Sequence, residues 1–226
     1  MIKNLLNLFF PKVCYACNLL LLDNERHICT TCRHNLPVTN YHFNNDNTVE
    51  KVFYGRVKIR KATSLLRFHK KGMVQKLLHN LKYRGHETIS KVLGTWLGSE
   101  LKKTGNFNDI DLVIPVPLHK TKFKKRGYNQ VTKFGNEIAM ALNINYREDI
   151  LTKISATKTQ VFKKRLARWS NNNEIFNLKN SEEIKGKHIL LVDDIITTGA
   201  TIEACASLLL EIPDVKISVA TMAIVE

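Results

Sequence analysis

The chain of 226 residues contains no apolar run that approaches the roughly 20 residues needed to span a bilayer. Its amino-terminal segment, residues 1–10, is apolar but short, and it ends at Pro11 without the small-residue cleavage site of a signal peptide. We therefore expect a cytoplasmic protein in which this segment covers nearby apolar surface, with peripheral membrane contact as the alternative. The tripeptides Gly-Lys-Ser and Gly-Lys-Thr are also absent, which argues against a nucleotide-binding P-loop.

Acidic residues are missing from three long stretches of a chain whose formal net charge is +15. Residues 51–86 contain eleven Lys or Arg and no acid, and residues 112–136 and 150–173 contain six basic residues each and no acid. In contrast, residues 174–226 contain nine acids and four bases. A solvated lysine-rich face is the usual origin of one such run. Three of them in one chain favour a polyanionic partner.

Cysteine is scarce, and four of the five cysteines lie close together as Cys14-x-x-Cys17 and Cys29-x-x-Cys32. A two-residue spacer lets a tight turn present two thiolates to one ion, and a second such turn completes a tetrahedron. Disulfides or unconnected thiols are the alternatives, but without a secretory signal stable disulfides are disfavoured. The spacing therefore predicts a structural zinc ion in a zinc-ribbon-like module at residues 1–45, which gains much of its folding energy from the metal.

The remaining residues, 50–226, alternate between helical and strand patterns, and the polar, Asn-rich residues 40–50 suit a connector. The spacing of apolar residues predicts helices at 72–81, 89–101, 129–142 and 200–211, and strands at 112–117, 188–192 and 215–224. Strands separated by helices predict an α/β fold with a doubly wound, mostly parallel sheet.

Two adjacent carboxylates, Asp193 and Asp194, follow the predicted strand 188–192. Open α/β sheets bind their ligands at this end of their strands. Because adjacent carboxylates repel each other, they need hydrogen-bond donors or a cation, which a ribose diol or a magnesium ion would supply. Receiver domains also end an apolar strand with two aspartates, but there the strand is the first of the sheet.

A phosphate-type turn comes next and leads into the predicted helix 200–211. Backbone N–H groups and hydroxyls at a helix amino terminus form an anion site, and glycine lets the backbone approach a phosphate closely. The residues of this turn are Thr197, Thr198, Gly199, Ala200 and Thr201. Together with the two carboxylates, they predict a site for a ribose 5-phosphate unit with magnesium.

Residues 193–201 resemble the phosphoribosyl-pyrophosphate (PRPP) motif of type I phosphoribosyltransferases. Four further segments and the paired cysteines are similar to the ComF family, which comprises competence protein F and its GntX-like relatives. These segments are residues 81–85, 115–130, 158–160 and 168–176. The resemblance runs from Cys14 almost to the end of the chain. It implies a type I phosphoribosyltransferase fold for residues 50–226.

The resemblance also implies roles for individual residues. Asp193 and Asp194 would hold the ribose hydroxyls, directly or through magnesium, and the turn 197–201 would hold the 5′-phosphate. The region around 118–120 corresponds to the pyrophosphate-binding turn of the fold. Candidate pyrophosphate ligands are Lys120 and Arg126, unless they belong to a solvated lysine-rich loop. The segment 153–171 corresponds to a mobile loop whose functional side chains would be Gln160 and Arg168. No catalytic residue is identified.

Three functions are consistent with these features. The first is a ComF-like protein that binds PRPP and acts in DNA uptake during natural competence, on single-stranded DNA. The second is an active phosphoribosyltransferase with an unidentified nucleobase-like acceptor, and the third is a sensor that uses the ligand site to regulate binding elsewhere. Basic and aromatic side chains together suit single-stranded nucleic acid. The aromatic residues of segment 51–86, which could equally belong to the core, are Phe53, Tyr54, Phe68 and Tyr83.

Overall fold

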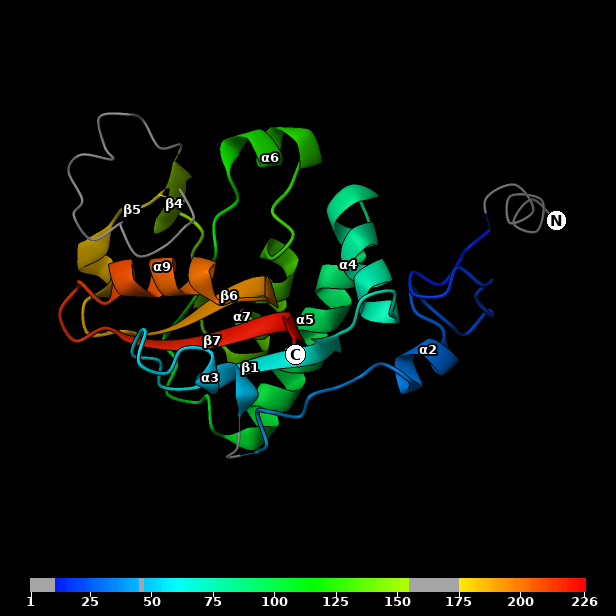
Figure 1. Cartoon of the computed structure of the whole chain (residues 1–226), viewed down its shortest axis with the longest axis horizontal. Coiled ribbons are helices and arrows are strands. Elements are labelled where there is room, and N and C mark those ends of the chain that lie inside the picture. The colour runs from blue at the N-terminus through cyan, green and yellow to red at the C-terminus, as the bar shows by residue number, and fades with distance from the viewer. Residues whose placement is uncertain (1–10, 45–46, 155–174) are drawn as a thin grey trace.

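A parallel five-stranded sheet forms the centre of the molecule (Figure 1). The computed structural model describes residues 11–44, 47–154 and 175–226. In spatial order the strands are β1 (Ala62–Phe68), β7 (Lys216–Val225), β6 (His188–Ile196), β2 (Leu112–Pro115) and β3 (Asn145–Tyr146). All four neighbouring pairs are parallel. The predicted doubly wound, mostly parallel sheet is therefore confirmed.

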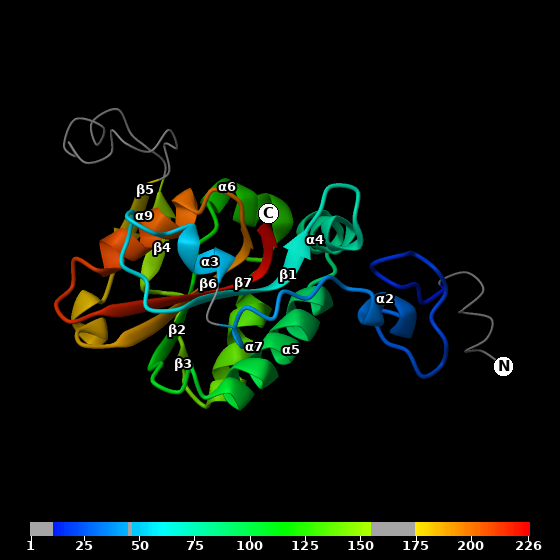
Figure 2. The same cartoon turned by 60° about the horizontal axis from the view of Figure 1, so that its bottom comes forward.

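Helices cover both faces of the sheet, as Figure 2 shows. Alternate residues of β6 point to opposite faces, so Leu190 packs with one layer of helices and Leu191 with the other. The first layer contains α4 (Met73–Tyr83), α5 (Thr88–Thr104) and α7 (Thr132–Leu142). The second contains α3 (Thr48–Lys51) and α9 (Ala200–Leu209). This double cover explains why the central strands are apolar without alternation.

The four-cysteine segment lies at the end of the molecule opposite α9 (Figure 1). It contains the short helix α2 (Thr30–His34). Its buried residues, such as Ile28 and Leu36, belong to the same apolar cluster as Leu77 and Leu81 of α4. The boundary between residues 1–45 and 50–226 stays a prediction, and the apolar core runs across it.

Three predictions about local structure are wrong. Strand β6 does not end at 192, because its pairing with β7 continues from Asp193–Thr221 to Ile196–Ile224. The turn expected near Lys120 is the start of helix α6 (Lys120–Arg126), whose amino end is capped by the His119 side chain. Residues 40–50 are more than a connector, because they include most of α3 and the buried side chain of Tyr41.

Strand β1 lies unexpectedly inside the basic segment 51–86. Of the aromatic residues in that segment, Phe53 is buried, whereas Tyr54 and Tyr83 are 86% and 67% exposed.

A two-stranded antiparallel sheet, β4 (Leu151–Ile154) with β5 (Ile175–Leu178), lies beside the main sheet. A short 3-10 helix at Ser181–Ile184 follows it. Within the described ranges, no helix is long and apolar enough to cross a membrane.

Candidate functional site

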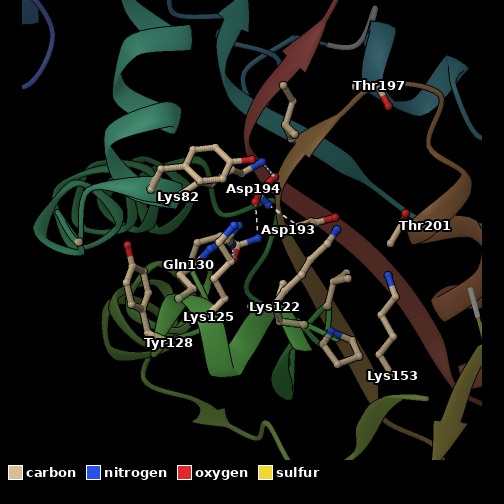
Figure 3. A pocket seen from close by; sticks show the side chains of 17 residues that line it. Lys82, Lys122, Lys125, Tyr128, Gln130, Lys153, Asp193, Asp194, Thr197 and Thr201 are labelled. Carbon is tan, nitrogen blue, oxygen red and sulfur yellow. Dashed lines mark hydrogen bonds and ion pairs between the residues drawn. The ribbon is translucent and has the colours of Figure 1, made fainter. Parts of the chain in front are cut away.

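A cavity of about 540 Å³ opens at the carboxyl ends of β2 and β6 (Figure 3). This is the edge at which parallel α/β sheets bind ligands. Of the residues predicted from the sequence, the cavity brings together Asp193, Asp194, Thr197, Thr201 and Arg126. It also contains Tyr83, which the sequence offered only as an aromatic residue of the basic segment 51–86. The further lining residues, to which the sequence gave no individual role, include Lys82, Lys122, Lys125, Tyr128, Gln130 and Lys153.

Asp194 is held by the side chains of Lys82 in α4 and of Gln130, which lies just before α7. It is only 4% exposed. Its Oδ1 lies 2.9 Å from the Lys82 Nζ at the end of α4, and its other oxygen accepts a hydrogen bond from the Gln130 side-chain amide. The Arg126 guanidinium donates in turn to the Gln130 side-chain oxygen. Both Asp194 oxygens are therefore engaged, and Arg126 acts on this carboxylate through Gln130.

Asp193 is in a different electrostatic state from its neighbour. Its Oδ1 accepts a hydrogen bond of 2.8 Å from the Asp194 backbone N–H. Burial and the adjacent charge of Asp194 raise the pKa of Asp193 to about 8, although that N–H and the ammonium groups of Lys82 and Lys153 act in the opposite direction. A cation or a pair of hydroxyl donors at this carboxylate would favour its charged form. Carboxylate oxygens are also ligands that fit Mg²⁺.

Because the pKa of Asp193 is raised in the folded protein, we expect replacement of this residue by asparagine to stabilise the protein. Between its ordinary value of 3.8 and about 8, the folded state binds more protons than the unfolded state, so the free energy of unfolding falls as the pH rises. An asparagine side chain does not titrate in this range, so the variant lacks this loss of stability. We expect Asp193→Asn to raise that free energy by about 1 kcal/mol near neutral pH and by less near pH 4, as measured by urea unfolding.

The exposed Glu182→Gln is the matched control and should show no such trend. A stabilisation by Asp193→Asn that did not change with pH would contradict the proposed protonation of Asp193.

The turn 197–201 connects β6 to the amino end of α9. Gly199 precedes the helix with a φ of +76° and provides no capping side chain. A small cavity of about 60 Å³ lies over this turn and is lined by residues 195–202 and Asp193. The helix amides and the threonine hydroxyls are thus placed around one small space beside Asp193, as an anion site requires. Figure 3 shows Thr197 and Thr201 on the side of Asp193 away from Lys125 and Tyr128.

Arg56 binds both this turn and helix α9, a role that the sequence did not indicate. Its Nη1 donates to the Thr198 backbone oxygen at 2.6 Å, and its Nη2 forms an ion pair with Glu203 of α9. A Cβ placed on Gly199 would lie 2.7 Å from Val52 and 3.0 Å from Phe53. The segment after α3 therefore fixes the turn, and one of the basic residues of 51–86 is structural.

Gly199 provides a test of the turn. We expect Gly199→Ala to lower the free energy of unfolding by about 2–4 kcal/mol, because positive φ and overpacking both disfavour it. The displaced amides should also lower the affinity for ribose 5-phosphate by about tenfold. Gly186→Ala is the matched control, since Gly186 has a φ of +70° but nothing within 4 Å of an added Cβ. It should cost about 1 kcal/mol and leave binding unchanged. Equal effects of the two variants would contradict the close fit at Gly199.

Basic residues of α6 line the opposite side of the cavity. Lys122, Lys125 and Arg126 share one face of this helix, because residues three and four apart are neighbours. Lys120, which the sequence favoured, is exposed and does not line the cavity. Its role as a pyrophosphate ligand stays a prediction, as does that of Arg126. The predicted loop residues Gln160 and Arg168 lie outside the described residues.

The four amino-terminal cysteines form a separate cluster. Their Sγ atoms all lie within 4.8 Å of one another, and all four are free thiols. The Cys17 and Cys29 sulfurs are 3.8 Å apart. In a tetrahedral zinc site with Zn–S bonds of about 2.3 Å, neighbouring sulfurs are also about 3.8 Å apart. The cluster could therefore hold a metal ion, and four thiolates are a donor set that suits structural zinc.

Backbone N–H groups point at one of these sulfurs. The N–H groups of Ala16 and Cys29 lie 3.4 Å and 3.3 Å from the Cys14 Sγ. Burial disfavours the Cys14 thiolate, but backbone hydrogen bonds outweigh it and lower the pKa of Cys14 to about 7. Such hydrogen bonds support the thiolate form that a metal requires.

Comparison with known proteins supports the fold of the chain. Residues 132–226 match the family described as the phosphoribosyl transferase domain. Competence protein ComFC of Bacillus subtilis is 30% identical over 202 residues, which cover 88% of this chain and 78% of that protein. The chain belongs to the ComF family. With its parallel sheet and matching domain, this ComF-family chain has the predicted type I phosphoribosyltransferase fold.

This ComF-family chain is also similar to a second named relative and to a solved phosphoribosyltransferase. DNA utilization protein YhgH of Shigella flexneri is 26% identical over 215 residues, which cover 88% of this chain and 91% of that protein. Among solved structures, purine phosphoribosyltransferase from Pyrococcus horikoshii matches 60% of this chain and 73% of its own, with 13% identity and a TM-score of 0.40.

Proposed function

We propose that this ComF-family protein binds PRPP with magnesium and acts on single-stranded DNA in the course of DNA uptake. The observation that carries the ligand proposal is the cavity at the ends of β2 and β6. It combines a carboxylate in need of donors, Asp193, with a phosphate-type turn and a cluster of cations on α6. Its volume of about 540 Å³ falls within the range of small-molecule sites.

Each part of PRPP has a counterpart in the cavity. The 5′-phosphate would accept hydrogen bonds from the turn 197–201, and the ribose hydroxyls would donate to Asp193. The pyrophosphate would face Lys122, Lys125 and Arg126. Asp193 would also hold magnesium, which supplies positive charge to the pyrophosphate oxygens when it is bound. Lys82 and Gln130 keep Asp194 fixed beside these groups.

The relatives and the charge distribution support the DNA part of the proposal. One relative is named DNA utilization protein and another Competence protein. The chain has a net charge of +15, and the segment 51–86 contains no acid. Lys and Arg on such a surface can contact phosphates, while exposed aromatic rings such as Tyr83 can stack on bases.

The DNA proposal is tested by the salt dependence of binding. We expect the affinity for an oligothymidylate of about 15 nucleotides to fall steeply as salt rises, because bound phosphates release counterions. Fluorescence anisotropy at several salt concentrations measures this, and duplex DNA of the same length is the comparison. A response that is flat with salt would contradict it.

Phosphoribosyl transfer is the second candidate function. Tyr83 and Tyr128 line the cavity, and their rings suit a planar acceptor. A nitrogen of the acceptor would form a bond to ribose C1 while pyrophosphate leaves with its bonding electrons, and the acceptor would release a proton to solvent. Pyrophosphate release in the presence of nucleobases, with a protein lacking the two carboxylates as control, tests this reaction.

A further inference from the structure

A second cavity, of about 370 Å³, lies between α4 and the four-cysteine segment. The cations Lys71, Lys76 and Arg84 line it, together with His79 and the side-chain amides of Asn18 and Gln75. No carboxylate is among its lining residues. Neither the ligand proposed above nor the metal cluster uses these side chains.

Hydrogen bonds fix the walls of this cavity. The buried Asn80 donates through Nδ2 to the Tyr15 backbone oxygen at 2.8 Å, which ties the four-cysteine segment to α4. The Asn18 N–H donates to the Cys14 backbone oxygen at 2.8 Å, so one wall is the turn that carries the first pair of cysteines. The Lys71 N–H donates to the Gln75 side-chain oxygen at 2.5 Å. These hydrogen bonds fix Asn80, Gln75 and the turn that carries Asn18 at the walls of the cavity.

The charge of the cavity points to an anionic ligand with several phosphates. Across the described ranges, no ion pair involves Lys71, Lys76 or Arg84. Like charges gathered without counter-charge create a positive potential that attracts polyanions. Lys and Arg are also the usual partners of nucleic-acid phosphates.

Two aromatic side chains of α4, His79 and Tyr83, lie between the second cavity and the first. The His79 ring lies 5.1 Å from the Tyr83 ring, one helical turn further along. Tyr83 lines the first cavity, is 67% exposed, and has the Arg126 guanidinium 5.8 Å from its ring centre. Exposed rings beside basic groups are the arrangement that binds single strands.

We propose that the second cavity binds the phosphodiester backbone of a single-stranded polynucleotide, and that His79 and Tyr83 stack on its bases between the two cavities. The proposal rests on the DNA role proposed above and gives that role a site on the molecule. The chain path runs along the outer face of α4, from the four-cysteine segment toward Asp194.

The test compares two variants in oligothymidylate binding by the full, metal-loaded chain. Lys76→Gln with Arg84→Gln should weaken binding by about tenfold or more and lower the salt slope by about 1.4, since two phosphate contacts are lost. Tyr83→Leu should weaken binding by about tenfold with an unchanged salt slope, since stacking releases no counterions. The exposed lysines Lys102 and Lys103 at the end of α5 provide the matched control, in which replacement of both by glutamine should have little effect.

The outcomes separate this proposal from the one on which it rests. If the natural protein binds the oligonucleotide but Lys76→Gln with Arg84→Gln binds equally well, the second cavity is not the DNA site, whereas the DNA role stands. If the natural protein does not bind at all, the DNA role itself fails. If the double variant loses binding only to vesicles that contain phosphatidylglycerol, the ligand is a lipid headgroup and the proposal is overturned. Unchanged zinc content and melting temperature establish that each variant is folded.

Discussion

Replacement of Asp193 and Asp194 together by alanine is expected to abolish binding of PRPP with magnesium. Asp193 provides the carboxylate that would accept the ribose hydroxyls, and Asp194 anchors Lys82 and Gln130 beside it. Loss of charged hydrogen bonds to a ligand costs several kcal/mol, so we expect the affinity to fall by about 100-fold or more. Isothermal titration calorimetry of both proteins, with zinc content measured in parallel, gives the comparison.

Single replacements separate the two carboxylates. Asp193→Asn should lose most ligand binding while the fold gains stability near neutral pH. Asp194→Asn should instead lower the free energy of unfolding by about 1–3 kcal/mol, because the charged partner of Lys82 is lost from a buried site. Glu182→Gln should change neither property. Ligand binding by the double alanine variant at the natural affinity would contradict the placement of the site.

Removal of the metal ligands is expected to have the largest effect on stability. Replacement of Cys14 and Cys17 by serine should reduce bound zinc from one per chain to none. Structural zinc contributes about 10–16 kcal/mol to the folding of zinc-finger peptides, and the four-cysteine segment shares its core with α4. We expect the free energy of unfolding to fall by at least about 3 kcal/mol, measured by urea unfolding, and the Tyr15–Asn80 contact to be lost.

Cys205→Ala provides the matched control for the cysteine replacements. Cys205 is fully buried among apolar residues of α9 and lies outside the cluster. Its replacement should cost about 1 kcal/mol and leave one zinc per chain. Full zinc content in the Cys14, Cys17 variant would contradict metal binding by the four thiols.

The sequence predicted those parts of the site that are contiguous in the chain. The turn 197–201 and the carboxylates before it form one segment, and each cysteine pair is a local turn. Their chemistry follows from residue type and spacing alone. The parallel sheet could also be predicted, because strands buried on both faces are apolar throughout.

The rest of the site depends on contacts between distant segments. Lys82 is 112 residues from Asp194, and Arg56 is 142 residues from the turn oxygen that it binds. No spacing rule connects such residues, since the topology brings them together. The sequence favoured Lys120 over Lys122 and Lys125 because α6 was expected to be a turn, and only the helix shows which side chains share the cavity face.

Strand β1 was missed for a similar reason. Thr63 and Ser64 lie in its first half, yet both are fully buried. Their polar side chains interrupt the apolar pattern that would indicate a buried strand. The strand is stabilised by its pairing with β7. The end of β6 was misjudged because carboxylates in a sequence indicate the end of a strand. This strand instead continues through Asp193 and Asp194, which line the cavity.

Phosphorus NMR of PRPP and magnesium titrated with the metal-loaded protein is the most direct test of the proposed ligand site. The 5′-phosphate and pyrophosphate resonances are separate, so they report on the turn 197–201 and on α6 independently. We expect both to shift and broaden with saturation at one ligand per chain, and Gly199→Ala to reduce the response of the 5′-phosphate most. Resonances that stay unchanged with folded, zinc-loaded protein would contradict the proposal that this cavity binds PRPP.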